Sequence, residues 1–140
     1  MGSIIVSIAV KKSIVAIMII EDGQVKLRIT ERIKDSHALE SNHASMIYAF
    51  MLALRYVRQY IQDNKTSSDI YFEVSNSTFV KWVENRYSKE TYQEDFIKAM
   101  QLLQELPIRY SFVYASKPKA MEYADAKYCK KEVISGLNID

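Results

Sequence analysis

The hydrophobic pattern opens with three short segments that are typical of β-strands. Residues 4–10 and 14–20 are rich in Ile and Val, and the Lys-Lys-Ser stretch between them predicts a tight turn. An Asp-Gly pair then predicts a hairpin. Over residues 25–33 apolar and polar side chains alternate, which predicts a strand with one solvent-exposed face. We therefore expect an antiparallel meander of three strands at the start of the chain.

The rest of the chain alternates between helical and extended patterns. Apolar residues recur at helical spacing from residue 41 to about 62, without Gly or Pro, which predicts a long helix packed on more than one side. The later segments predict a strand at 70–74, helices at 78–86 and 88–106, a strand at 108–114 and a last helix at 120–131. The order β-β-β-α-β-α-α-β-α describes a five-stranded mixed sheet with helices on both faces. This is an α/β (mixed α+β) architecture, in a single domain over residues 1–140.

Composition narrows the class of protein. The 140 residues are 49% hydrophobic and 26% charged, which excludes global disorder and allows a sizeable core. The net charge of +2 does not by itself indicate nucleic-acid or membrane binding, although local patches matter. The single cysteine excludes a disulfide framework, and no segment reaches the roughly 18 apolar residues of a membrane span. Two lysines interrupt the apolar start, which argues against a signal peptide, so we expect an intracellular protein, cytoplasmic or nuclear if eukaryotic, with no membrane partner.

Three stretches in this order of elements resemble the ribonuclease H family. Residues 41–46 (SNHASM) resemble the family's helix opening, Asn-x-Ala-Glu-Leu/Met. Residues 70–82 (IYFEVSNSTFVKW) resemble its strand-then-helix stretch, where Thr-Asp-Ser-x-Tyr-Val is usual. Residues 122–127 (EYADAK) resemble its closing helix, with Ala-Asp or Cys-Asp. The resemblance covers nearly the whole chain, and it implies a ribonuclease H-like fold.

The resemblance also implies a chemistry, the hydrolysis of phosphodiester bonds by two Mg²⁺ ions held on four acidic residues. The acid of the first strand falls near Ser7 or Ala9, and the first twenty residues contain no acidic side chain to replace it. The other three positions are Ser45, Asn76 and Asp125, of which only Asp125 is a carboxylate. Together with Ser7 and Ala9 we call these the five vestigial positions, or the vestigial site. One carboxylate cannot neutralise two divalent cations. We therefore expect a catalytically degenerate member that is not an enzyme and has no metal or cofactor.

Other groupings of reactive side chains are less favoured as sites. Glu73 and Glu40 are the acids that could rebuild a metal site, but we interpret Glu73 as a polar residue at a strand edge. His37, His43 and Cys129 are scattered along the chain and lack the spacing of metal ligands.

Polar and basic side chains near the vestigial site are candidates for binding a nucleic acid. By resemblance, four of them occupy positions where the family's polar side chains approach the minor groove and backbone, although Asn42 and Ser77 are equally good helix caps. Four lysines add positive charge that could contact phosphates, or could simply be solvated. The candidates are Lys11, Lys12, Asn42, Asn76, Ser77, Thr78, Lys117 and Lys119.

The degenerate site leaves three functions open. The first is a non-catalytic binding or assembly module that engages an unknown protein or a second copy of itself. Degenerate domains of this family occur in reverse transcriptases, splicing machinery and viral proteins, and the ten tyrosines here suit an interface. The second is binding of an RNA–DNA hybrid or duplex through the vestigial groove. The third and least favoured is a metal-dependent nuclease with a rearranged site.

Overall fold

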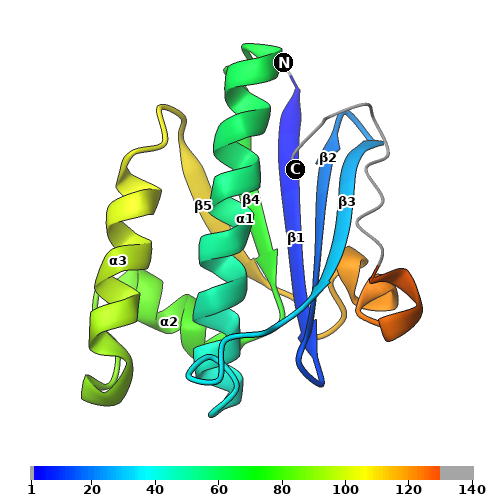
Figure 1. Cartoon of the computed structure of the whole chain (residues 1–140). Helices are drawn as coiled ribbons and strands as arrows, with labels where there is room; N and C mark the ends of the chain where they lie inside the picture. The colour runs from blue at the N-terminus through cyan, green and yellow to red at the C-terminus, as the bar shows by residue number, and fades with distance from the viewer. Residues whose placement is uncertain (1, 130–140) are drawn as a thin grey trace.

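The structure is a computed structural model that describes residues 2–129, and its centre is one five-stranded mixed sheet (Figure 1). The strand order is β3-β2-β1-β4-β5, in which the first three strands are antiparallel and β4 and β5 run parallel to β1. The strands are β1 (Ser3–Lys11), β2 (Ile14–Glu21), β3 (Gln24–Arg32), β4 (Asp69–Val74) and β5 (Tyr110–Tyr114). The five predicted strands and the mixed α+β architecture are thus confirmed.

Two tight turns connect the strands of the meander. Lys12 and Ser13 have φ angles of 48° and 67°, and Asp22 and Gly23 have φ angles of 53° and 78°. Two successive residues with positive φ are typical of type I′ turns, whose twist matches that of antiparallel strands. The first turn adopts this geometry without a glycine, and it places Lys12 at its exposed tip.

Three α-helices cover one face of the sheet (Figure 1). They are α1 (Asn42–Asn64), α2 (Ser77–Asn85) and α3 (Gln93–Gln104), with a short 3-10 helix, η1 (Glu90–Tyr92), in front of α3. The helix predicted to begin at Ser88 thus begins later. Ser88 is buried, and its hydroxyl donates to the carbonyl of Lys89 at 3.0 Å instead of capping a helix.

The main core lies between this helical layer and the sheet. Phe50 of α1 is fully buried at its centre, and its ring lies 5.3 Å from that of Phe72 on β4 and 5.2 Å from that of Phe79 on α2. The ring of Phe112 on β5 lies 5.4 Å from Phe50. This aromatic cluster connects four elements, and it fixes where α1 and α2 begin relative to the ends of the strands.

Two short 3-10 helices, η2 (Lys119–Tyr123) and η3 (Ala126–Tyr128), cover the second face of the sheet over β1, β2 and β3, while Tyr71 of β4 and Val113 of β5 are exposed. The prediction of one continuous helix over 120–131 is therefore wrong up to residue 129, and residues 130 and 131 lie outside the described part of the chain. Side chains of the sheet interrupt the helix: Thr30 donates to the carbonyl of Tyr123 at 2.8 Å. Asp125 then has extended backbone, with φ −142° and ψ 141°. A small apolar cluster lies under η2, made of Ala9, Ala16, Met18, Ile20, Ala120 and Ala124.

No helix within residues 2–129 has the length and apolar character needed to cross a lipid bilayer.

Candidate functional site

An open hollow of about 660 Å³ lies at the end of the sheet where β1 and β4 finish. Its walls come from the β1–β2 turn, the loop before α1, the segment between β4 and α2, and the loop after β5. The carboxyl ends of the three parallel strands meet here, which is where open α/β sheets commonly bind ligands. Glu40 is the one carboxylate in its lining, so the hollow is polar but nearly free of negative charge.

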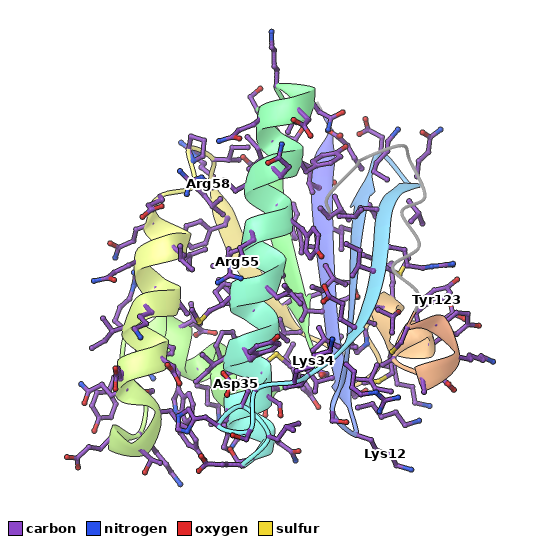
Figure 2. All side chains as sticks on the ribbon, in the orientation of Figure 1. Lys12, Lys34, Asp35, Arg55, Arg58 and Tyr123 are labelled. Carbon is purple, nitrogen blue, oxygen red and sulfur yellow. The ribbon has the colours of Figure 1, made fainter. Side chains whose placement is uncertain are left out.

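The structure brings half of the predicted nucleic-acid-binding residues into this hollow. Lys11, Lys12, Asn42 and Asn76 line it, and Lys12 extends outward at the lower end of the sheet in Figure 2. The remaining candidates are outside the lining. Ser77 and Thr78 form the first turn of α2, Lys117 follows the lining residue Ser116, and Lys119 belongs to η2.

Two of the vestigial positions, Ser45 and Asn76, line the hollow but also hold the fold together. Ser45 is buried and its hydroxyl donates to the carbonyl of Ala38 at 2.7 Å, which ties α1 to the preceding loop. Asn76 is the N-cap of α2, because its Oδ1 accepts from the backbone N–H of Phe79 at 2.9 Å. In both places a neutral side chain makes a structural bond where the family pattern has a metal-binding acid.

The same Asn76 side chain determines the tautomer of a neighbouring histidine. Asn76 Nδ2 lies 3.1 Å from His43 Nδ1, and since Oδ1 is already used by the helix cap, Nδ2 is the donor. His43 Nδ1 therefore accepts, and the neutral ring carries its proton on Nε2. The ring packs against Trp82 and Tyr92, with centroids at 5.1 and 6.0 Å. Sequence analysis missed this cluster, because residues far apart in the chain form it.

A second polar cluster connects β1, β4 and η2 on the far face of the sheet. Ser7 is fully buried and lies beside Glu73 in the register of β1 and β4. The Ser7 hydroxyl donates to Glu73 Oε1 at 2.9 Å and accepts from the backbone N–H of Ala120 at 2.9 Å. Glu73 also accepts from the backbone N–H of Lys119 at 2.7 Å and pairs with its ammonium at 3.3 Å. We call these four residues the Ser7 network.

The Ser7 network corrects our interpretation of Glu73. Glu73 is not at an edge of the sheet, since β4 lies between β1 and β5, and its side chain is only 16% exposed. Lys119, a candidate for contacting phosphate, pairs with Glu73 while its side chain stays 54% exposed. The signal available in the sequence was a single carboxylate inside an otherwise apolar strand, which requires buried partners. The alternative first-strand position, Ala9, is buried in the small apolar cluster under η2.

Competing effects act on the pKa of Glu73. Burial raises it, but hydrogen bonds from the backbone of Lys119 and from Ser7, together with the Lys119 ammonium, outweigh burial and lower the pKa below its ordinary 4.5. A carboxyl group whose pKa is lowered by folding stabilises the protein above its unfolded-state pKa. That contribution disappears as the pH falls through the folded-state pKa.

We expect Glu73→Gln to destabilise the protein at pH 7 by about 1–3 kcal/mol, because the buried donors of Ser7 and Lys119 lose a charged acceptor. The difference in unfolding free energy between wild type and variant should shrink as the pH is lowered below 4.5. Urea unfolding at several pH values measures it. Glu84→Gln, on exposed α2 surface, is the control. A pH-independent difference would contradict the ionised network.

Asp125, the one acid kept from the family pattern, lies outside the hollow. It is exposed, and its carboxylate accepts from the backbone N–H of Lys127 at 3.0 Å as the cap of η3. Within residues 2–129 no three His, Cys, Asp or Glu side chains are close enough together to hold a metal ion. The five vestigial positions are therefore divided among four places: Ser45 and Asn76 line the hollow, Ser7 belongs to its network, Ala9 lies in the apolar cluster under η2, and Asp125 caps η3.

Comparison with known proteins identifies the fold. No protein-family model and no curated protein matches the sequence. Among solved structures, LC11-RNase H1, isolated from compost by a metagenomic approach, matches with a TM-score of 0.69 and 16% identity over 89% of this chain and 91% of its own. LC11-RNase H1 in complex with an RNA/DNA hybrid matches with a TM-score of 0.64 and 16% identity, covering 95% and 94%. RNase H1 from the halophilic archaeon Halobacterium salinarum NRC-1 matches with a TM-score of 0.62 and 14% identity, covering 89% and 93%. The chain has the ribonuclease H fold, as the sequence predicted.

Proposed function

We propose that the protein is a non-catalytic ribonuclease H-like module that binds a nucleic acid in the hollow at the end of β1 and β4. The observation that carries the proposal is that the hollow has lost two acidic side chains of the family pattern and is lined by two lysines. Neutral Ser45 and Asn76 stand where the family pattern has acids, and Lys11 and Lys12 line the same hollow. Without those acids, a phosphate backbone is no longer repelled, and the metal ions that the acids would need are not required.

The two helices that begin at the hollow add to this preference for anions. The N-caps of α1 and α2, Ser41 and Asn76, both line it, and neither helix has an acidic residue in its first turn. No residue of either helix therefore neutralises the partial positive charge of its N-terminus, and Glu40, which precedes Ser41, is paired with His37 at 2.7 Å. One solved neighbour with this fold, LC11-RNase H1, has been observed with an RNA/DNA hybrid, which makes a hybrid the first nucleic acid to test.

Binding of a labelled RNA–DNA hybrid, followed by fluorescence anisotropy at several salt concentrations, tests the proposal. We expect dissociation constants of roughly 1–100 μM that weaken with salt, as for contacts with phosphates. In Lys11→Gln/Lys12→Gln the slope of log K against log salt should fall by about 2, with at least a roughly tenfold loss of affinity at low salt. Double-stranded DNA and double-stranded RNA, measured in parallel, show whether the hybrid is preferred.

The matched control is Lys65→Gln at the other end of the fold. Lys65 is exposed and has φ 50°, close to the φ of 48° at Lys12. Both variants therefore replace a lysine whose backbone is in the left-handed conformation. Equal losses in the control and the double variant, or no salt-dependent binding at about 100 μM protein, would contradict nucleic-acid binding and favour the assembly module. Mg²⁺-dependent cleavage that disappears in Asp125→Asn would contradict the non-catalytic part.

A further inference from the structure

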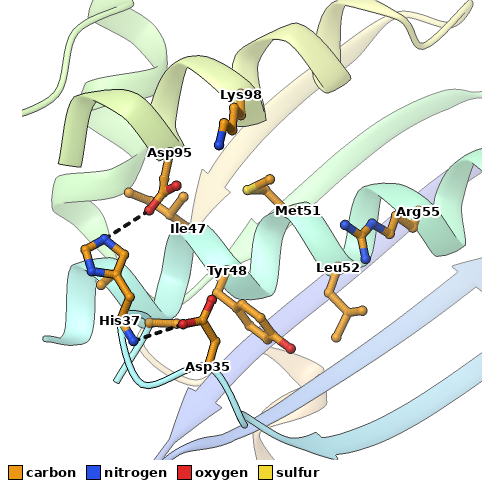
Figure 3. Close-up of a pocket in the computed structure, with 11 residues that line it drawn as sticks. Asp35, His37, Ile47, Tyr48, Met51, Leu52, Arg55, Asp95 and Lys98 are labelled. Carbon is orange, nitrogen blue, oxygen red and sulfur yellow. Dashed lines mark hydrogen bonds and ion pairs between the residues drawn. The ribbon is translucent and has the colours of Figure 1, made fainter. Parts of the chain in front are cut away.

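A second groove lies away from the hollow, between α1 and α3, and is closed at one end by the loop before α1 (Figure 3). It has a volume of about 200 Å³, and its floor is formed by apolar side chains of α1, mainly Ile47, Met51 and Leu52. The lining residues of α1 recur at spacings of three and four, so they lie along one side of the helix; they are Ala44, Ile47, Tyr48, Met51, Leu52 and Arg55. We call this the α1–α3 groove.

The two ends of the α1–α3 groove have opposite charge. Asp35 and Asp95 lie at the end near the start of α1, where His37 contacts both: its backbone N–H donates to Asp35 at 2.9 Å, and its Nε2 lies 3.3 Å from Asp95 (Figure 3). Arg55 lies at the other end, and Lys98 extends from α3 toward the groove. The groove thus has an apolar floor between one end with two carboxylates, which share His37, and another end with the Arg55 guanidinium.

Two polar groups of the groove make no hydrogen bond or ion pair with any residue from 2 to 129, the Arg55 guanidinium and the Tyr48 hydroxyl. Neighbouring positions on α1 differ. Arg58 pairs with Glu105 at 3.2 Å, and the Tyr56 hydroxyl donates to Glu31 at 2.9 Å. Two polar groups of α1 that have no partner among residues 2–129 thus lie in the groove, where a ligand could use them.

We propose that the α1–α3 groove binds a short extended peptide segment of a partner protein, with a basic residue at one end, an acidic residue at the other and one apolar side chain between them. The lining of α1 runs from Ala44 to Arg55, which is about 16 Å at 1.5 Å per residue. An extended peptide covers this distance with about five residues. The volume of about 200 Å³ suits one large apolar side chain packed on Met51 and Leu52. The charges at the two ends and the size of the groove therefore both favour a short peptide with an apolar residue at its centre.

Amide chemical shifts of the full chain, titrated with acetyl-Arg-Ala-Leu-Ala-Glu-amide, test this proposal. We expect saturable shifts confined to residues 35–38, 44–55 and 95–98. Peptides with two arginines or two glutamates as end residues should bind roughly tenfold more weakly, as should a peptide with Gly in place of Leu. In Arg55→Glu both ends of the groove become acidic, so the peptide with two arginines should now bind better than the mixed peptide.

Arg58→Glu, one turn along α1 and outside the groove lining, is the matched control and should leave peptide binding unchanged. Equal effects of the two variants, or no saturable shifts at about 5 mM peptide, would overturn the proposal. So would equal binding of N-acetyl-leucine, because the groove would then be a site for small carboxylates. The result does not depend on nucleic-acid binding, since Lys11 and Lys12 lie in the other hollow.

Discussion

Replacing Phe50 by Ala is expected to lower the free energy of unfolding by about 3–5 kcal/mol, the largest loss for any single change that we consider. The side chain is fully buried, and rings from β4, α2 and β5 surround it at centroid distances of 5.2 to 5.4 Å. A truncated side chain leaves a cavity that rigid aromatic neighbours cannot fill. The edge-to-face contact with Phe72 is lost as well.

Urea unfolding followed by circular dichroism measures this loss. Ile97→Ala is the control, because Ile97 lies on α3 and is 47% exposed, and it should cost no more than about 1 kcal/mol. If Phe50→Ala cost as little as the control, the aromatic cluster would not be the centre of the core, and the positions of the two helix starts at the hollow would need another explanation.

Restoring an acid on the first strand by Ser7→Asp is expected to destabilise the protein by about 3 kcal/mol at pH 7. Ser7 is fully buried, and its hydroxyl lies 2.9 Å from the Glu73 carboxylate. A second carboxylate there would lose the hydrogen bond that the serine donates and would repel Glu73. The repulsion would raise the pKa of the carboxyl pair, so the cost should decrease as the pH falls and the pair takes up a proton.

Ser7→Asn is the matched control, since asparagine has the size of aspartate without its charge. The two variants should differ in unfolding free energy at pH 7 and converge near pH 3. A difference that stays constant with pH would show that size, not charge, is the cause. Equal stability of Ser7→Asp and wild type would mean that the first strand still tolerates an acid. It would contradict the conclusion that the Ser7 network requires a neutral side chain at this position.

The strands and the long helix were predictable because local patterns determine them. The Asp-Gly turn, the Ile- and Val-rich segments and the uninterrupted apolar stripe of α1 need no information from distant parts of the chain. The last helix was not predictable in this way. Residues 120–124 have helical propensity, but Ser7 takes the N–H of Ala120 and Thr30 takes the carbonyl of Tyr123 as partners. Tertiary hydrogen bonds outweighed local preference there.

The candidate site was predictable only in its residue types. The sequence placed neutral side chains at Ser45 and Asn76 and lysines at the first turn, and the structure brings these groups to one hollow. It did not reveal that Glu73 accepts from Ser7 and Lys119, because the register of two strands 66 residues apart sets that contact. The α1–α3 groove likewise requires knowing which side of α1 faces α3.

The Ser7 network has a consequence for the synthesis of the protein. The hydrogen bond from Ala120 to Ser7 joins residues 113 positions apart, so the second face of the sheet cannot close until η2 has been made. At about 5–20 residues per second, the ribosome needs roughly 5–20 s to proceed from residue 20 to residue 120. During that time Met18 and Ile20 of the nascent meander have no cover from η2. The apolar side chains on this face of the meander are therefore exposed for seconds during synthesis, and we expect closure of the second face to be a late step of folding.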